Sequence, residues 1–173
     1  ILTIGYARRA ATYKRLDLPF HDPDRLFSIL TDSAQPIQII LAAKAHPRDI
    51  PGKEMIQRLV KWTKDTKFRD HALFIPDYDS RIAKYLVVGS DAWLNVPKKG
   101  EEASGTSGMK SGLSGGRQFS IDDGWMYEVP DNFYIKIEDD ENSSVVAANI
   151  YQLMQYRIAS EFYTPTGQPL SDT

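Results

Sequence analysis

Short apolar runs alternate with helix-like segments along the first half of this chain. The apolar runs have the length of β-strands and occupy residues 1–6, 36–42, 72–75 and 92–95. Helices are predicted between them, at residues 23–31, 52–66 and 80–88. Because strands that alternate with helices in this order form parallel βαβ units, the pattern predicts an α/β fold built on a parallel sheet.

Residues 98–124 differ in character, because they hold most of the chain's 11 glycines together with many serines and threonines. A flexible linker has the same kind of composition. Met109, Lys110 and Leu113 instead indicate a tight loop that leads into a short helix. We therefore expect an ordered loop here, with the linker as the alternative.

The last part of the chain predicts a strand at residues 133–137, an acidic turn at residues 138–141 and then an amphipathic helix. The apolar stripe of this helix consists of Val146, Ile150, Leu153, Met154 and Ile158. We predict one partial domain over residues 1–163 and a flexible tail over residues 164–173, where two prolines and Gly167 occur.

Length and charge limit the classes of function. A chain of 173 residues fits one domain, and its net charge of -2 predicts no general attraction to nucleic acid or membrane. No apolar run approaches the roughly 20 residues of a membrane helix. The absence of cysteine rules out a thiolate metal site and fits a cytoplasmic protein, and we expect no metal. The chain starts at Ile1 inside a predicted strand, as expected of a fragment.

Four cations, Arg8, Arg9, Lys14 and Arg15, directly follow the first predicted strand. In a parallel sheet, ligands bind at the carboxyl ends of the strands. Guanidinium and ammonium groups at such a point favour an anion site, because they pair with phosphate oxygens. A solvated basic turn would give the same pattern, so both interpretations stay open.

The loop at residues 101–110 is the second candidate anion site. Its small residues let the backbone approach a ligand closely, and the hydroxyls of Thr106 and Ser107 add donors at a predicted helix start. Lys110, one turn into that helix, would lie beside a bound phosphate, either as a cation or as the amine that holds an aldehyde cofactor. The spacing does not match a P-loop, and a flexible loop remains the alternative.

Six ordered stretches resemble landmarks of the α-glucan phosphorylases, the family of the glycogen, starch and maltodextrin phosphorylases. Glu-Ala-Ser-Gly-Thr-Ser-Gly-Met-Lys at residues 102–110 resembles the cofactor-lysine motif of that family, and residues 3–15 resemble its strand and substrate-phosphate segment. The other matching stretches are residues 42–47, 75–78, 91–97 and 123–125. The resemblance extends over residues 2–128, most of the chain.

The resemblance implies a Rossmann-like parallel sheet with helices on both faces, as the C-terminal half of a GT-B-type two-domain glycosyltransferase. Such an enzyme uses inorganic phosphate to release glucose 1-phosphate, with retention, from the non-reducing end of an α-1,4-glucan. The phosphate group of pyridoxal 5′-phosphate assists. The missing N-terminal domain would be a partner, the chain alone would be inactive, and a homodimer of the parent is left open.

The resemblance also implies roles for residues around the phosphates. Lys110 would hold the cofactor as a Schiff base, Arg8 and Lys14 would neutralise phosphate charge, and Arg9 would grip the substrate phosphate bidentately. Arg9, Lys14 and Lys110 are accordingly the catalytic candidates. For Lys44 and His46, which belong to another matching stretch, a turn-shaping role is the simpler reading.

Further implied contacts concern the cofactor ring and the sugar. Thr106 and Ser107 would contact the cofactor phosphate, and Tyr78 would lie against the ring or be an ordinary half-buried tyrosine. Sugar hydroxyls would be bound by Glu102 and by the backbone of Ala103, Ser104 and Gly105. Trp93 and Trp125 are expected in the core rather than as sugar platforms.

The chain departs from the family pattern at Ala43, at residues 114–118 and at Asp122. A buried Asp122 needs a partner, for which Arg117 is the candidate. These departures keep open a non-catalytic glucan-binding or interaction domain of the same fold. A nucleotide-sugar glycosyltransferase is the third reading, and it would need a nucleobase pocket and no cofactor lysine.

Overall fold

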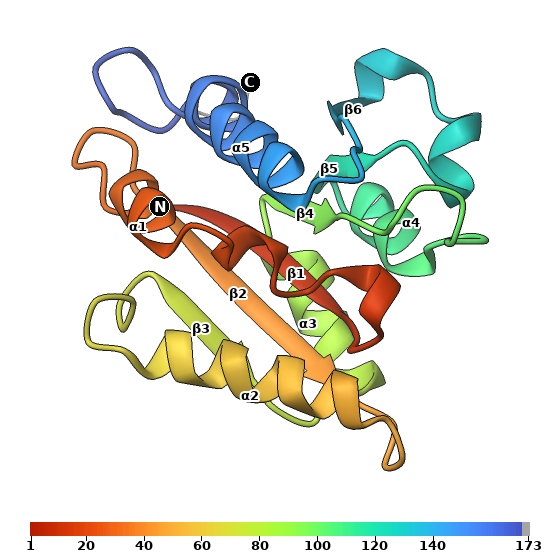
Figure 1. Ribbon diagram of the computed structural model, residues 1–173. Helices are drawn as coiled ribbons and strands as arrows, with labels where there is room; N and C mark the ends of the chain where they lie inside the picture. Colours follow the sequence, from red (N-terminus) through yellow and green to blue (C-terminus); the bar gives the residue numbers. More distant parts are fainter. Residues whose placement is uncertain (171–173) are drawn as a thin grey trace.

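The structure is a computed structural model that describes residues 1–170. Within them, parallel strands form one sheet in the order β3-β2-β1-β4-β5-β6 (Figure 1). The strands are β1 (Leu2–Arg9), β2 (Ile37–Lys44), β3 (Ala72–Ile75), β4 (Ala92–Asn95), β5 (Arg117–Ile121) and β6 (Tyr134–Ile137). The chain builds β1, β2 and β3 in one direction and then returns to add β4 on the other side of β1. Ligands bind at such a switch point in open α/β sheets.

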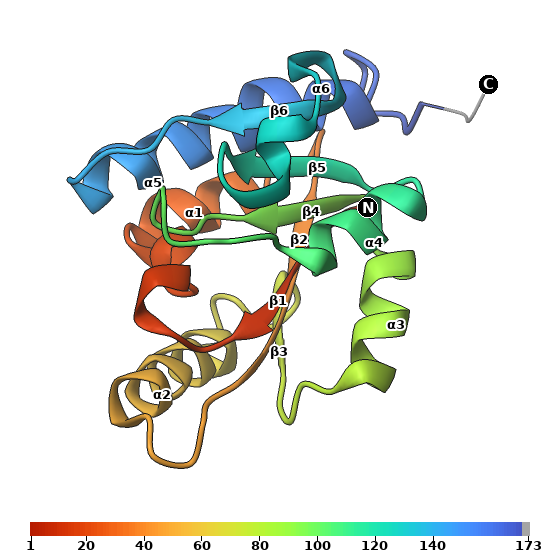
Figure 2. The same ribbon diagram turned by 90° about the vertical axis from the view of Figure 1, so that its right-hand side faces the viewer.

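Helices cover both faces of the sheet. The helices are α1 (Pro23–Leu30), α2 (Ile50–Lys64), α3 (Ser80–Gly89), α4 (Thr106–Leu113), α5 (Ser143–Leu153) and α6 (Ala159–Phe162). Helices α1, α2 and α5 lie on one side of the sheet, and α3 and α4 lie on the other (Figure 2). This architecture confirms the predicted α/β fold class with a parallel sheet and helices on both faces.

Helix starts follow from local sequence. The side chains of Asp22, Asp49 and Asp79 accept hydrogen bonds from backbone N–H groups in the first turns of α1, α2 and α3. In α1 and α2 a proline stands near the start, where its missing N–H costs no helical hydrogen bond. Each α-helix that connects two strands of the β1–β4 half therefore begins directly after an aspartate that caps it.

Strand β1 separates two apolar clusters. Leu2, Ile4 and Tyr6 are buried in the larger core, which extends to α1, α2 and α5. On the other side, a Cβ atom at Gly5 would lie 2.8 Å from the ring of Trp93, so glycine makes room for that indole. Trp93 is buried, as expected of a core residue.

The elements predicted from sequence are present, with boundaries shifted by a few residues at most. Strand β5 was not predicted. In the apolar stripe, Leu153 is half-buried and the other four residues are buried, and a π-helical stretch over Met154–Ile158 joins α5 to α6. Among residues 1–170, no helix combines the length and apolarity needed to cross a membrane.

Residues 164–170, part of the segment predicted as a flexible tail, form a turn. Tyr163 and Pro169 make an isolated antiparallel bridge, and the Leu170 amide donates to the Phe162 carbonyl at 2.9 Å. Residues 171–173 lie outside the described residues.

Candidate functional site

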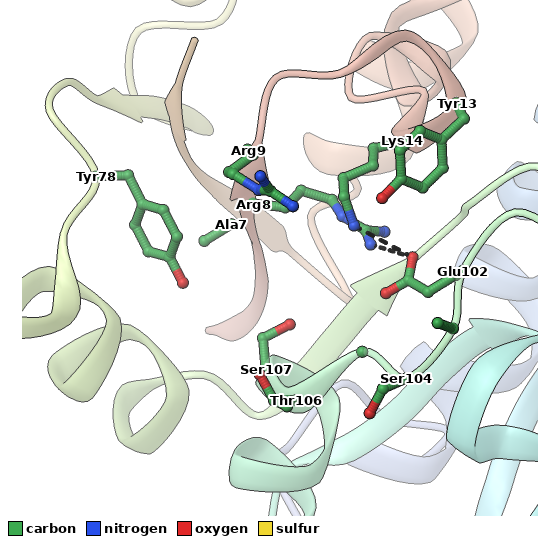
Figure 3. A pocket seen from close by; sticks show the side chains of 12 residues that line it. Ala7, Arg8, Arg9, Tyr13, Lys14, Tyr78, Glu102, Ser104, Thr106 and Ser107 are labelled. Atoms are coloured by element: carbon green, nitrogen blue, oxygen red, sulfur yellow. Dashed lines mark hydrogen bonds and ion pairs between the residues drawn. The ribbon is translucent and has the colours of Figure 1, made fainter. Parts of the chain in front are cut away.

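A cavity of about 350 Å³ opens at the carboxyl ends of β1 and β4, at the switch point of the sheet. It is lined by Ala7, Arg8, Arg9, Tyr13, Lys14, Tyr78, Glu102, Ala103, Ser104, Gly105, Thr106 and Ser107 (Figure 3). Ten of the eleven residues predicted for the site are in this set, and Lys110 is the exception. Segments far apart in the sequence thus meet around one hollow. In Figure 3 the cations approach from the β1 side and the hydroxyls of α4 from the opposite side.

Arg8, Glu102 and Lys14 form a buried charge cluster. Arg8 is 6% exposed, and its guanidinium donates to the carboxylate of Glu102 and to the side-chain oxygen of Asn95. Lys14 Nζ lies 3.5 Å from the same oxygen, Oε2, of Glu102. Two cations thus share one carboxylate, and Arg8 Nε is buried without a hydrogen-bond partner among residues 1–170. The excess positive charge and the unpaired N–H favour an added anion.

Tyr6 fixes the turn that carries Lys14. The Tyr6 hydroxyl donates to the Lys14 carbonyl at 2.8 Å, with the Arg15 carbonyl 3.2 Å away. Burial raises the pKa of Tyr6 well above its ordinary value, so the hydroxyl keeps its proton. Arg15 lies outside the cavity lining, and its guanidinium donates to the Val96 carbonyl at 3.0 Å and to Asp139 at 2.7 Å. Three of the four cations that follow the first predicted strand therefore line the cavity, whereas Arg15 has a structural role.

Helix α4 presents two different faces. Gly105, which precedes it, and Gly108 face Trp125, since Cβ atoms there would lie 3.5 Å and 3.1 Å from the indole. With roughly 3.6 residues per turn, Thr106, Ser107 and Lys110 fall on the opposite face. Thr106 and Ser107 line the cavity, and Lys110 is exposed about one turn further along.

Tyr78 enters the cavity from the turn between β3 and α3. The turn contains Asp77 with a φ of 54°, and Asp79 then caps α3. Burial raises the pKa of Tyr78, against the lowering effect of the nearby Arg8 charge. The Tyr78 hydroxyl is therefore protonated at neutral pH and can donate a hydrogen bond.

Tyr13 also lines the cavity, although it was not among the predicted site residues. Its ring centroid lies 4.7 Å from Lys14 Nζ, a cation–π distance. Its position inside the basic segment of residues 8–15 was the signal available in the sequence.

Residues of two other matching stretches, 42–47 and 91–97, take structural positions. His46 Nδ1 accepts from the Arg48 amide at 3.2 Å, as a turn-shaping histidine does, and neither Lys44 nor His46 lines the cavity. Asp91 accepts from the Thr3 amide at 2.8 Å at the amino edge of the sheet.

The predicted pairing of Asp122 with Arg117 is wrong. Asp122 pairs with Lys99 at 3.7 Å and with Lys136 at 3.5 Å, while Arg117 pairs with Glu161 at 2.9 Å. Asp122 and Arg117 are five positions apart along an extended segment. Their side chains therefore point to opposite faces.

Replacing Gly105 with alanine should disturb the cavity more than the same change at Gly100. Both glycines have a φ near the left-handed region, +87° and +86°. A Cβ atom at Gly105 would lie 2.8 Å from Glu102 Oε1, whereas one at Gly100 would meet nothing within 4 Å. We expect Gly105→Ala to lower the free energy of unfolding by about 1–3 kcal/mol and Gly100→Ala by about 1 kcal/mol. Urea denaturation measures both, and equal losses would contradict the assigned contact.

Fold and site together define a class: a parallel α/β domain with a cation-lined cavity at its switch point. The family model of the carbohydrate phosphorylases matches residues 7–158. The chain is 44% identical over 171 residues to a glycogen phosphorylase of Mycobacterium tuberculosis, covering 94% of this chain and 20% of that protein. It is 43% identical over 169 residues to a glycogen phosphorylase of Aquifex aeolicus, covering 94% and 24%. A maltodextrin phosphorylase of Thermococcus litoralis is 36% identical over 170 residues, covering 94% and 20%.

The chain therefore belongs to the carbohydrate phosphorylase family. It spans between a fifth and a quarter of the length of these three relatives.

Proposed function

We propose that this chain is the phosphate-binding part of an α-1,4-glucan phosphorylase of the GT-B type. The parent protein would use inorganic phosphate to release glucose 1-phosphate, with retention, from the non-reducing end of a glucan. The observation that carries the proposal is the buried Arg8–Glu102–Lys14 cluster facing the start of α4 across one cavity. Similarity to relatives named glycogen phosphorylase and maltodextrin phosphorylase supports the substrate class. We also propose a cytoplasmic location, in keeping with a cysteine-free sequence.

The cations would act on the phosphates. Arg9 is exposed at the cavity, so its guanidinium is free to grip the incoming phosphate with two N–H groups. Arg8 and Lys14 are held by Glu102 and would neutralise charge from within. When bound, the cofactor supplies a second phosphate group beside the substrate phosphate. Two such anions repel each other, which is why several fixed cations are needed around them.

The residues present fit pyridoxal 5′-phosphate. The unpaired Arg8 Nε, the Thr106 and Ser107 hydroxyls and the first amides of α4 form a donor set for its phosphate. Lys110 is exposed on the same helix face, about 4.5–6 Å further along the axis. Lys110 would hold the cofactor covalently, and Tyr78 would lie against its ring.

The sugar would be held by the loop before α4. Glu102 Oε2 is occupied by Arg8 and Lys14, whereas Oε1 lies toward Gly105. Oε1 is therefore the oxygen free to accept from a sugar hydroxyl. The backbone of Ala103, Ser104 and Gly105, which lines the cavity, would complete the hydrogen bonds.

Substitution of Arg9 tests the phosphate role. In the parent enzyme, Arg9→Ala should raise the KM for inorganic phosphate about 10–100-fold, because a charge-assisted bidentate contact is lost. Arg9→Lys should recover only part of it, since an ammonium cannot form the fork. Arg69→Ala, an exposed arginine in the turn before β3, is the matched control and should leave KM unchanged. An unchanged KM in Arg9→Ala would remove Arg9 from the phosphate site.

The non-catalytic reading remains the rival of this proposal, favoured by the departures around Asp122. It predicts a parent that binds maltodextrin yet neither takes up pyridoxal 5′-phosphate nor releases glucose 1-phosphate. Uptake of pyridoxal 5′-phosphate or release of glucose 1-phosphate by the parent would exclude the non-catalytic reading.

A further inference from the structure

Asp123 is a buried carboxylate that serves the loop in front of α4. It is 3% exposed, and its Oδ2 accepts from the amides of Gly100 and Glu102, both at 3.0 Å. Oδ1 accepts from the amide of Gly124 at 2.9 Å. Asp123 makes no salt bridge with any other residue in the range 1–170. Three backbone N–H groups thus compensate its charge.

The next two residues hold the same loop from its other end. The Trp125 amide donates to the Ser104 carbonyl at 3.0 Å. Gly124 has a φ of +60°, and a Cβ atom there would lie 2.6 Å from that same carbonyl oxygen. The Trp125 ring then packs beside Gly105 and Gly108, which removes any room for side chains on that face of α4.

We propose that residues 123–125 are a positioning clamp for the cavity, with Asp123 its central residue. The loop of residues 96–105 contains no helix or strand, so it needs other elements to fix its course. Asp123 fixes the backbone of Glu102, and the carboxylate of Glu102 in turn aligns Arg8 and Lys14. None of residues 123–125 lines the cavity. The clamp fixes the position of the sugar-binding backbone relative to the charge cluster. This consequence rests on the proposed function.

Hydrogen–deuterium exchange on the full 173-residue chain directly measures the hydrogen bonds that Asp123 accepts. Asp123→Ala should speed exchange at the amides of Gly100 and Glu102 at least about tenfold beyond any change in global stability, because their acceptor is gone. Asp123→Asn should restore most of the protection, since its amide oxygen can occupy the place of Oδ2. Asp91→Ala is the matched control, because Asp91 also accepts from a backbone amide, that of Thr3, at the opposite edge of the sheet. It should leave these amides protected.

Titration of the same variants with inorganic phosphate, followed through the amide signal of Ser107, measures their affinity for phosphate. Asp123→Ala should bind phosphate about tenfold more weakly than the unchanged chain, and Asp123→Asn should bind within about threefold of it. If Asp123→Ala does not fold, Gly124→Ala tests the clamp through its contact with Ser104 and should show the same loss of protection.

Two results would overturn the clamp: unchanged protection at Gly100 and Glu102 in Asp123→Ala, or lost protection with unchanged phosphate affinity. If the unchanged chain binds no phosphate, the proposed function fails on this chain. The exchange comparison between the Asp123 and Asp91 variants still decides whether Asp123 positions the loop.

Discussion

Replacing Arg8 with alanine is expected to lower the free energy of unfolding by about 3–5 kcal/mol, the range for breaking a buried ion pair. The variant leaves the Glu102 carboxylate, 7% exposed, with Lys14 alone at 3.5 Å, and the Asn95 side chain without its guanidinium donor. It also removes the central cation of the cavity, so inorganic phosphate binding should be lost. Urea denaturation and a phosphate titration of the 173-residue chain measure the two effects.

Arg58 provides the matched comparison, because it forms an ion pair with Asp17 at 2.7 Å on the surface. Arg58→Ala should cost no more than about 1 kcal/mol, since solvent screens exposed pairs. If Arg8→Ala costs no more than Arg58→Ala, the charge cluster is not the buried network described above.

Replacing Lys110 in the parent enzyme is expected to have the largest effect on activity. Lys110→Ala should lower the rate of phosphorolysis at least about 100-fold, because the cofactor whose phosphate group assists the reaction would no longer be held. Stability should change little, because Lys110 is exposed and its side chain makes no hydrogen bond or ion pair across residues 1–170. Loss of activity would then come from loss of the cofactor and not from unfolding.

Reduction with borohydride in the presence of pyridoxal 5′-phosphate gives a second readout that does not depend on turnover. Peptide mapping should find the reduced cofactor on Lys110 and on no peptide of the Lys110→Ala variant. Lys84, an exposed lysine on the neighbouring helix α3, provides the control, and Lys84→Ala should keep the label. Label retained in Lys110→Ala would contradict the assignment of the cofactor lysine.

The apolar runs were enough to predict the β1–β4 half of the fold, because each of those strands is mostly apolar and a helix lies between each consecutive pair. Strand β5 escaped prediction because Gln118 and Ser120 interrupt its apolar residues. Both polar side chains are nevertheless buried and bonded: Asn95 Nδ2 donates to Ser120 at 3.2 Å, and Gln118 donates to the Gly116 carbonyl at 3.0 Å. Such partners come from another strand or a turn, which a single-strand pattern does not contain.

The residues that line the cavity could largely be predicted from the sequence, but the ion pairs and hydrogen bonds between them could not. Resemblance supplied Arg8, Lys14 and Glu102, yet only the strand order brings β1 beside β4 and lets both cations share one carboxylate. The role of Asp123 depends on amides 21 and 23 positions away in sequence. The wrong partner for Asp122 has the same origin, since Lys99 and Lys136 lie on other segments.

The most direct test of the central claim is to incubate the parent protein with maltodextrin, inorganic phosphate and pyridoxal 5′-phosphate and to assay glucose 1-phosphate. The phosphate site described above predicts release of the α-anomer, dependent on both phosphate and cofactor, and strongly lowered by Lys110→Ala. A folded parent that binds maltodextrin but releases no glucose 1-phosphate and takes up no cofactor would contradict it.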